Sequence, residues 1–279
     1  MAAMPVAIVI LFLMLAPMPA SAQNERVDYV VAELEKSGFP RAVAEGLFAD
    51  ERVKMYPPRE VAPRTIDWDK IIASLVAPQS VQRGEKFHSQ YQEILDKAQK
   101  DFGVDKTAIV GLLRLESDFG RNTGDYVVFN VFYTSMMRAE EEKRWKWFAE
   151  NLIALAQYCK KGGYDCLDVR GSYGGALGPA QFLPKSAELF GADGDGNGVI
   201  DLTHPLDAIY SAANFLVEHG WHEDQMAALG KYYGSANGYP RAVMAYAEAL
   251  RKSLGMTPPP PAPESNNSDS NSRVIGRTN

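Results

Sequence analysis

One acidic residue lies on the apolar face of an expected helix. The residues on that face recur at i, i+3, i+4, i+7 and i+10, namely Ile109, Leu112, Leu113, Glu116 and Phe119. Burial disfavours the ionised form of a carboxyl group, and the C-terminal end of a helix also disfavours an anion. Both effects raise the pKa of Glu116 above its reference value of about 4.3. A carboxylic acid that stays protonated near neutral pH can donate a proton to a glycosidic oxygen.

The same periodicity permits a structural explanation for Glu116. A buried carboxylate can pair with an arginine, and Arg121 and Arg144 are the candidates. Asp118 is the nearest second carboxylate in sequence, but two helical residues place it about 200° around the axis from Glu116. We therefore do not expect Asp118 to act on the same substrate atom. A lone catalytic acid and a structural ion pair both stay open at this point.

A second cluster with recognisable chemistry begins at Asp193 and reads DGDGNGVID. Asp193, Asp195 and Asn197 occupy positions 1, 3 and 5 of a loop with glycine at position 6, as in an EF-hand. The carbonyl of Val199, at position 7, is the next expected ligand. The bidentate glutamate of position 12 is missing, because His204 stands there. An Asp/Gly-rich surface turn without metal is the alternative interpretation.

Helical patterns surround these two motifs. Apolar residues recur at helical spacing between capping and stop signals, and we expect helices over roughly 27–37, 80–103, 105–117, 143–160, 205–219 and 240–254. Ser80 is the expected cap of the second helix and Asp105 that of the third. The Pro-containing stretch 56–63 indicates an extended connector. No long alternating run predicts a strand, so the expected fold class is mainly α.

Composition narrows the class of protein. The chain has 279 residues, of which 46% are hydrophobic and 23% charged, enough for one sizeable core. Its net charge of -6 argues against a nucleic-acid binder with a general basic surface. Cys159 and Cys166 are the only cysteines, seven residues apart, and a disulfide between them is plausible in an exported protein.

Both ends of the chain are expected to lie outside the folded domain. Residues 1–22 carry a short apolar run followed by Ala20-Ser21-Ala22, which indicates a secretory signal peptide cleaved after Ala22. No Lys or Arg precedes the run, so an uncleaved anchor is the alternative. Residues 257–279 are rich in Pro, Ser and Asn and predict a disordered tail. The domain is therefore expected to span 23–256.

Three long segments resemble, in order, the lytic murein transglycosylase B family (glycoside hydrolase family 103). They read FGVDKTAIVGLLRLESDFGRNTG, GSYGGALGPAQFLPKS and DGDGNGVIDLTHPLDAIYSAANFLVEHGW. The resemblance covers roughly 77–249. It implies a lysozyme-like helical core over about 98–250 with an additional helical lobe. It also implies cleavage of the β-1,4 bond between N-acetylmuramic acid and N-acetylglucosamine in peptidoglycan, with a 1,6-anhydro product and no added water.

The resemblance implies roles for individual residues. Glu116 matches the single catalytic acid/base of the family. The positions that match contacts to the sugar strand are Ser172, Gln181, Tyr233, Tyr239, Arg144 and Trp147. The family has an asparagine where this chain has Gly234, and the serine of the same family element is displaced to Ser235. The family also lengthens the calcium loop, which makes Asp207, at position 15, the implied last ligand.

These observations lead to an expected function and two alternatives. The resemblance implies a peptidoglycan lytic transglycosylase of the periplasm of a Gram-negative bacterium, with structural Ca²⁺ and no organic cofactor. A hydrolytic muramidase and a non-catalytic peptidoglycan-binding scaffold are the alternatives. Glycan strands are the expected partner, and the C-terminal tail is a candidate site for a cell-wall protein. We expect no bound nucleic acid and no membrane span after signal cleavage.

Overall fold

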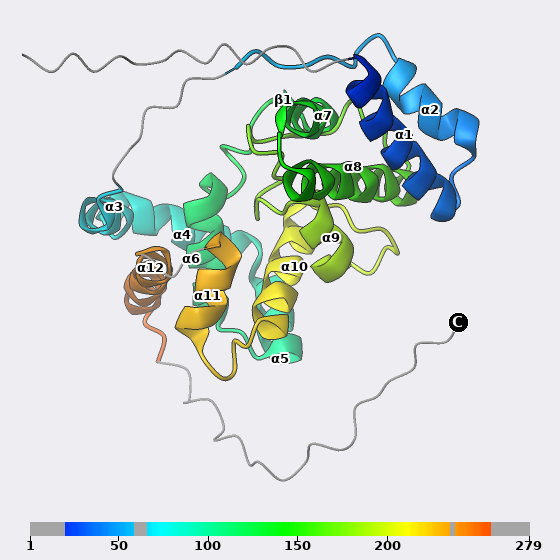
Figure 1. Cartoon of the computed structure of the whole chain (residues 1–279). Helices are drawn as coiled ribbons and strands as arrows, with labels where there is room; N and C mark the ends of the chain where they lie inside the picture. Colours follow the sequence, from blue (N-terminus) through cyan, green and yellow to red (C-terminus); the bar gives the residue numbers. More distant parts are fainter. Residues whose placement is uncertain (1–19, 59–65, 235–237, 258–279) are drawn as a thin grey trace, which may run out of the picture.

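The computed structural model of the chain describes residues 20–58, 66–234 and 238–257 (Figure 1). Most of these residues are helical, which confirms the prediction of a mainly α fold. The predicted signal peptide, 1–22, and tail, 257–279, fall almost entirely outside the described residues. Among the described helices, none combines the length and apolar character that crossing a bilayer requires.

The described residues form twelve helices and one two-stranded antiparallel sheet. The helices are α1 Ala20–Lys36, α2 Arg41–Ala49, α3 Trp68–Leu75, α4 Pro78–Gln90, α5 Gln92–Phe102, α6 Lys106–Ser117, α7 Val128–Arg138, α8 Glu142–Gly162, α9 Pro184–Phe190, α10 Pro205–Glu218, α11 Gln225–Tyr233 and α12 Tyr239–Ser253. The strands β1, Tyr126–Val127, and β2, Arg170–Gly171, pair Tyr126 with Gly171.

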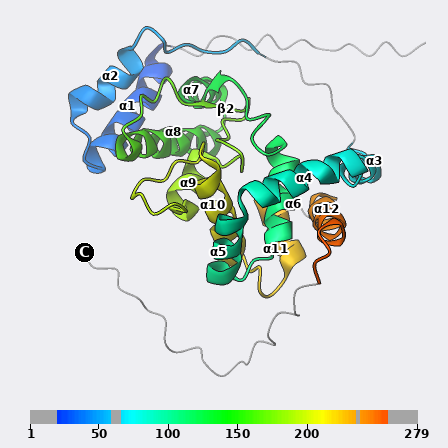
Figure 2. The same cartoon turned by 180° about the vertical axis from the view of Figure 1, so that it is seen from behind.

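The helices pack in two groups that are joined by α9 (Figures 1 and 2). The first group contains α1, α2, α7 and α8, and the second contains α3 to α6 together with α10 to α12. Helix α9 packs on α8 from the first group and on α10 from the second.

Helix α7, in the first group, binds the non-helical segment 52–56. Asn130, fully buried on α7, donates from its amide to the carbonyl of Arg52 at 2.9 Å and accepts from the backbone N–H of Lys54 at 3.2 Å. The N–H of Tyr56 donates to the hydroxyl of Thr134 at 2.9 Å. The start of the predicted connector is thus bound to α7. Side chains of α7 satisfy backbone groups that have no strand partner.

Helix α6 is the central element of the second group. Its residues Ile109, Leu112 and Leu113 are fully buried, as the periodicity predicts. Helix α12 crosses it closely at Gly111, where a Cβ atom would lie 2.8 Å from the carbonyl oxygen of Val243. A glycine at this position allows the two backbones to approach each other, which brings the start of α12 to the end of α6.

A buried ion pair ties α6 and α12 together at the other end of their contact. The guanidinium of Arg251 bonds to the carboxylate of Asp105, and the exposed fraction of each side chain is 9%. The other Asp105 oxygen caps α6, because it accepts the N–H of Thr107 at 2.8 Å. Asp105 therefore has the predicted capping role and a second role that its sequence position does not reveal.

The prediction of one helix from Ser80 to Gly103 is wrong. The segment forms α4 and α5, which are separated at Tyr91, and α4 begins after Ala77 with a proline at its first turn. Ser80 is buried inside α4 rather than capping it, and its hydroxyl accepts a hydrogen bond from Arg114 at 3.0 Å. The Ser80 side chain, which the local sequence predicts as a helix cap, thus contributes to the packing of α4 on α6.

The two cysteines are paired in the structure. Cys159 near the end of α8 bonds to Cys166, and their Cα atoms lie 5.5 Å apart. Both side chains are buried. The short loop between them includes Gly163, which ends α8 in a left-handed conformation.

Candidate functional site

The chain turns sharply directly after Glu116. Helix α6 ends at Ser117, and Asp118 and Phe119 follow with φ values of 51° and 63°. Gln181, in the glycine-rich segment, has φ 52° and is the only other described non-glycine residue with positive φ. Side chains with a Cβ adopt this conformation at a cost of about 1–2 kcal/mol each. The three strained residues of the described chain thus lie in the two segments that carry the predicted acid and the predicted glycan contact Gln181.

Ser117 joins these two segments. Its hydroxyl donates to the carbonyl of Pro179 at 2.7 Å and accepts the N–H of Gly120 at 2.7 Å. The Gln181 amide donates to the carbonyl of Thr123 at 3.3 Å. These bonds hold the glycine-rich segment against the end of α6, beside Glu116.

Glu116 is held by a tyrosine rather than by an arginine. The hydroxyl of Tyr239, on the first turn of α12, donates to Oε1 of Glu116 at 2.5 Å. Burial raises the pKa of Glu116, and the Tyr239 hydrogen bond lowers it by a smaller amount. The net result is a pKa of about 7. Within the described residues no ion pair involves Glu116, and no charged group contributes to the shift of its pKa. The increase has the direction that the sequence predicts.

The alternative ion pair of Glu116 with Arg121 or Arg144 is not formed. Arg121 lies 3.9 Å from Asp118 instead. Asp118 also bonds to Arg83 and to Arg114, each at 3.3 Å. Asp118, which follows the last residue of α6, is therefore surrounded by arginines and makes no described contact with Glu116.

Two tyrosines beside Glu116 extend the site. Tyr233 stacks on Tyr239 with ring centroids 4.7 Å apart and an angle of 10° between the planes. Tyr232, which the sequence analysis did not single out, donates from its hydroxyl to the carbonyl of Ala180 at 2.6 Å. Burial raises the pKa of Tyr232 well above its usual value, and the charge of Glu116 adds to the increase. Tyr232 thus lies close enough to sense the ionisation of Glu116.

Two of the predicted glycan contacts line one pocket. Gln181, Tyr232 and Tyr233 contribute to a pocket of about 280 Å³ between the glycine-rich segment and α11. The exposed fraction of Tyr233 is 43%, so its ring is accessible to a ligand in that pocket. The structure thus brings Gln181 and Tyr233 together, beside the tyrosine that bonds to Glu116.

The other predicted contacts belong to the first group of helices. Arg144 lines a separate pocket of about 430 Å³ together with Tyr56 and Tyr173. Trp147, 44% exposed, packs its ring on Phe148 of the same helix. These two residues are near each other on α8 but are not among the residues that line the pocket of Gln181.

Ser172 has a structural contact in the glycine-rich turn. Its hydroxyl accepts the N–H of Ala176 at 3.0 Å, and its own N–H donates to the Ala176 carbonyl at 2.9 Å. The turn projects Tyr173, whose exposed fraction is 41%, and this ring packs against that of Tyr126. Tyr173 is a residue of the site region that the sequence analysis missed.

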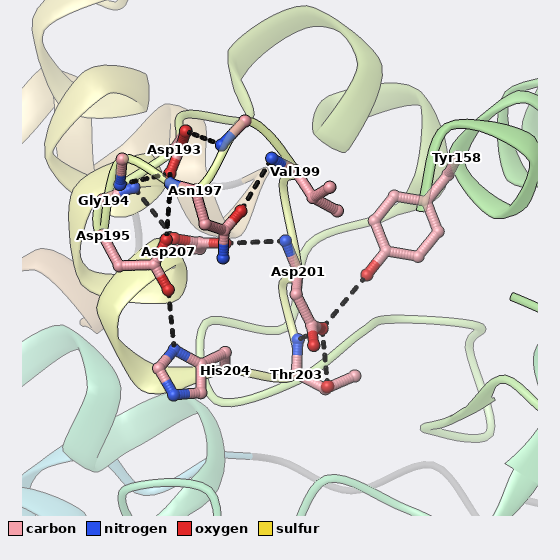
Figure 3. Close-up of polar contacts among 12 residues, drawn as sticks. Tyr158, Asp193, Gly194, Asp195, Asn197, Val199, Asp201, Thr203, His204 and Asp207 are labelled. Carbon is pink, nitrogen blue, oxygen red and sulfur yellow. Dashed lines mark hydrogen bonds and ion pairs between the residues drawn. The ribbon is translucent and has the colours of Figure 1, made fainter. Parts of the chain in front are cut away.

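The predicted calcium loop brings its carboxylates together. Asp193, Asp195 and Asp207 each have an oxygen within 4.8 Å of the others (Figure 3). Asp207 is fully buried at the start of α10, and its two oxygens accept the N–H groups of Gly194 at 2.8 Å and Asp201 at 2.7 Å. These bonds hold Asp207 against the loop from 13 residues away.

Asn197 shapes the loop, and one basic side chain lies beside the carboxylates. The Asn197 side-chain oxygen accepts the N–H of Val199 at 2.8 Å, which shapes the loop. His204 is the only basic side chain of the described residues within 4.0 Å of the three carboxylates, with its Nδ1 3.9 Å from Asp195. Three carboxylates without a lysine or arginine partner form an oxygen-rich set that fits a hard divalent cation such as Ca²⁺.

Comparisons with known proteins agree with this arrangement. A family model described as transglycosylase SLT domain matches residues 22–251. Membrane-bound lytic murein transglycosylase B of Escherichia coli (strain K12) is 31% identical over 196 residues, which cover 70% of this chain and 53% of that protein. The chain therefore spans about half the length of this curated relative.

Solved structures share the fold. Soluble lytic transglycosylase SltB1 from Pseudomonas aeruginosa is 24% identical, with a TM-score of 0.72 over 82% of this chain and 99% of that chain. The Escherichia coli lytic transglycosylase Slt35 in complex with calcium is 19% identical, with a TM-score of 0.68 over 83% of this chain and 94% of that chain. Because the family model matches most of the sequence, from within α1 to within α12, the chain belongs to the family of transglycosylase SLT domains.

Proposed function

We propose that the protein is a peptidoglycan lytic transglycosylase that cleaves the β-1,4 bond between N-acetylmuramic acid and N-acetylglucosamine and forms a 1,6-anhydromuramyl product. The observation that carries the proposal is the isolated carboxyl group of Glu116, whose pKa is near neutrality and whose described partner is a tyrosine. Membership of the transglycosylase family and the murein-cleaving relative support the same reaction.

In the first step, neutral Glu116 protonates the oxygen of the glycosidic bond. Its Oε1 accepts the Tyr239 hydrogen bond, so Oε2 is the oxygen left to carry the proton that is donated. The C1–O bond of the muramyl residue breaks, and positive charge develops at C1, where the N-acetyl group of the same sugar stabilises it. Ordinary glycosidases use a second carboxylate for this step, and the surroundings of Glu116 hold none among the described residues.

In the second step, the Glu116 carboxylate removes the proton from the muramyl C6 hydroxyl. The C6 oxygen attacks C1 of the same sugar and closes the 1,6-anhydro ring, so no water is consumed and the carboxyl group is protonated again. Between the steps the Tyr239 hydroxyl stabilises the carboxylate through its hydrogen bond. One side chain thus acts as the acid and then as the base.

The groove that holds the sugar strand is part of the proposal. Gln181 and Tyr233 supply a polar group and an aromatic ring in one pocket, and Tyr233 stacks on Tyr239, which bonds to Glu116. Arg144 and Trp147 supply a cation and an exposed ring on α8. Rings that stack on sugars and polar groups that bond to hydroxyls are typical of carbohydrate sites. Ser172 contributes by fixing the turn that carries Tyr173.

The experiment that tests the proposed reaction is a product analysis. Purified peptidoglycan sacculi are digested with the enzyme, and the released muropeptides are identified by mass spectrometry. We expect 1,6-anhydromuramyl ends, which are lighter by one water than reducing ends. Reducing ends would instead show a hydrolytic muramidase, and binding to sacculi without any released product would show a non-catalytic scaffold.

The loop that begins at Asp193 is proposed to bind structural Ca²⁺. The proposed ligands are the side chains of Asp193, Asp195, Asn197 and Asp207 and the carbonyl of Val199. The convergence of three carboxylates supports the proposal, and one structure of similar fold is a calcium complex. A bound cation would offset the repulsion between the carboxylates and would fix the loop that precedes α10.

Chelation is expected to lower the melting temperature of the protein. A ligand that binds only the folded state at about 100 times its Kd stabilises that state by about 2.7 kcal/mol, which is roughly 5–10 °C for a domain of this size. We therefore expect EDTA to lower the Tm by that amount, and added Ca²⁺ to restore it. The Asp195→Ala variant should be insensitive to both. An unchanged Tm of the wild type at complete chelation would contradict the calcium site.

The location of the protein is proposed to be the periplasm of a Gram-negative bacterium. The sequence pattern of residues 1–22 and the murein-cleaving relative support this assignment. The mature chain is then proposed to consist of a catalytic domain over 23–256 and a tail over 257–279. Amino-terminal sequencing of the exported protein is expected to start at Gln23.

A further inference from the structure

Helix α3 packs on the start of α12, the helix that carries Tyr239 (Figure 1). Its cap is Asp67, whose carboxylate accepts the N–H of Lys70 at 3.1 Å. Trp68 is its first residue and is partly buried. Trp68 precedes the segments on which the family resemblance rests, and nothing in its neighbourhood in the sequence indicates a role in the site.

The indole of Trp68 lies directly against the backbone of Gly238. A Cβ atom at Gly238 would lie 2.1 Å from Trp68 Cγ and 2.5 Å from its Cβ, so only glycine fits beneath the ring. The φ of Gly238 is -68°, which any residue can adopt. Space for Trp68, rather than backbone conformation, therefore requires glycine at this position. The contact fixes the residue that immediately precedes Tyr239.

Trp68 also meets the two stacked tyrosines edge-on. Its ring centroid lies 5.9 Å from that of Tyr233, at an angle of 85°. It lies 6.4 Å from that of Tyr239, at 86°. Edge-to-face pairs of this kind stabilise a ring cluster beyond the area that they bury. The three rings form one packed cluster, and the Tyr239 hydroxyl reaches from it to Glu116.

We propose that Trp68 is a positioning residue for the proposed acid/base Glu116, acting through Gly238 and Tyr239. The proposal rests on the proposed function, because it concerns the geometry of the proton-transferring group. A hydrogen bond to a reacting carboxyl group must be held to within about half an ångström to be effective. Without neighbours, the side chain of Tyr239 could rotate and move its hydroxyl away from Glu116. The contacts of its ring with Trp68 and Tyr233 restrict this rotation.

The proposal is tested by comparing the pH dependence of kcat/KM in a set of variants. Glu116 must be protonated to act, so activity falls on the basic side as Glu116 ionises. Tyr232 and Tyr239 are the titratable groups that face it in the described chain. The Tyr239→Phe variant removes a donor that favours the carboxylate, so its basic limb should move to higher pH and its kcat should fall about tenfold.

Trp68→Ala is expected to reproduce the behaviour of Tyr239→Phe. Its basic limb should shift in the same direction, and its kcat should fall by roughly the same factor with little change in KM. The double variant should show no further shift, because both substitutions break the same hydrogen bond. Trp68→Phe, which keeps a ring, should recover part of the activity. The matched control is Asp69→Asn, at the residue next to Trp68. It removes the exposed ion pair between Asp69 and Arg241 and should retain the wild-type pH profile.

Different results would separate a structural role from the proposed one. A Trp68→Ala enzyme with a lower Tm and a lower kcat but a basic limb at the wild-type pH would overturn the inference. So would a double variant in which the two shifts add. Failure of the proposed function would be visible earlier, in a wild-type enzyme that forms no anhydro product. The two failures are therefore distinguishable.

Discussion

Replacing Glu116 by glutamine is expected to reduce the rate of peptidoglycan cleavage by roughly 10³-fold. General acid–base catalysis contributes about 10²–10⁴ to rates, and here one carboxyl group serves both proton transfers. Glutamine keeps the shape and can still accept the Tyr239 hydrogen bond, but it cannot donate a proton to the leaving oxygen. Release of muropeptides from sacculi, measured at pH 6 for equal amounts of folded protein, gives the ratio of rates. Activity of the variant within threefold of the wild type would contradict the mechanism.

The same substitution is expected to stabilise the protein at alkaline pH. Glu116 has a pKa of about 7 in the folded chain, against 4.5 for an unperturbed side chain. The folded state therefore binds the proton more tightly, and its stability decreases as the pH rises from about 4.5 through 7. Above pH 8 the ionised group costs up to about 3 kcal/mol, which Glu116→Gln should recover in urea unfolding. At pH 4, Glu116 is mostly protonated in the folded and in the unfolded state. The difference in stability between the variant and the wild type should therefore be much smaller.

Replacing Arg251 by methionine is expected to lower the free energy of unfolding by about 3–5 kcal/mol. The substitution removes the partner of Asp105 and leaves a buried carboxylate without a counter-charge. Arg251 also donates to the hydroxyl of Thr107 at 3.0 Å. The carboxylate of Asp105 caps α6, the helix that carries the proposed acid/base Glu116, so the loss should destabilise both α6 and its contact with α12. Urea unfolding at pH 7 measures the change.

A matched substitution separates the buried pair from the exposed one. Glu248 also bonds to Arg251, but its side chain is 47% exposed, so Glu248→Gln should cost less than about 1 kcal/mol. The double variant Asp105→Asn with Arg251→Met should be more stable than Arg251→Met alone, since no unpaired charge remains in it. Equal losses in the free energy of unfolding for Arg251→Met and Glu248→Gln would show that the buried pair stabilises the fold no more than the exposed one.

The sequence could predict what depends on neighbours in the chain. The helical stripe around Ile109 and Leu113 placed Glu116 toward the interior because side chains three and four apart share a helix face. The spacing of Asp193, Asp195 and Asn197 predicted a loop in which carboxylates converge. The structure buries Ile109, Leu112 and Leu113 fully, leaves Glu116 partly buried at the end of that stripe, and brings the carboxylates of the loop together. Asp207 lies beyond the ordinary loop, and only the family resemblance pointed to it.

Features that depend on long-range packing were missed. The ring of Trp68 meets that of Tyr239, and the two residues are separated by more than half the chain, so no local pattern relates them. The break at Tyr91 has no glycine or proline to mark it. Helix α7 was not predicted because most of its residues are buried, which removes the polar face that makes a helix recognisable. The strands β1 and β2 have two residues each, too few for an alternating pattern.

The ionisation of Glu116 in the folded, substrate-free protein is the most direct measurement of the central claim. A carbon-13 NMR titration of glutamate side-chain carboxyl groups, with Glu116→Gln used to assign the signal, reports it without any assay of activity. The account predicts a midpoint near pH 7, and an upward displacement of that midpoint in Tyr239→Phe. A midpoint near 4.5, as for a glutamate in water, would contradict the account.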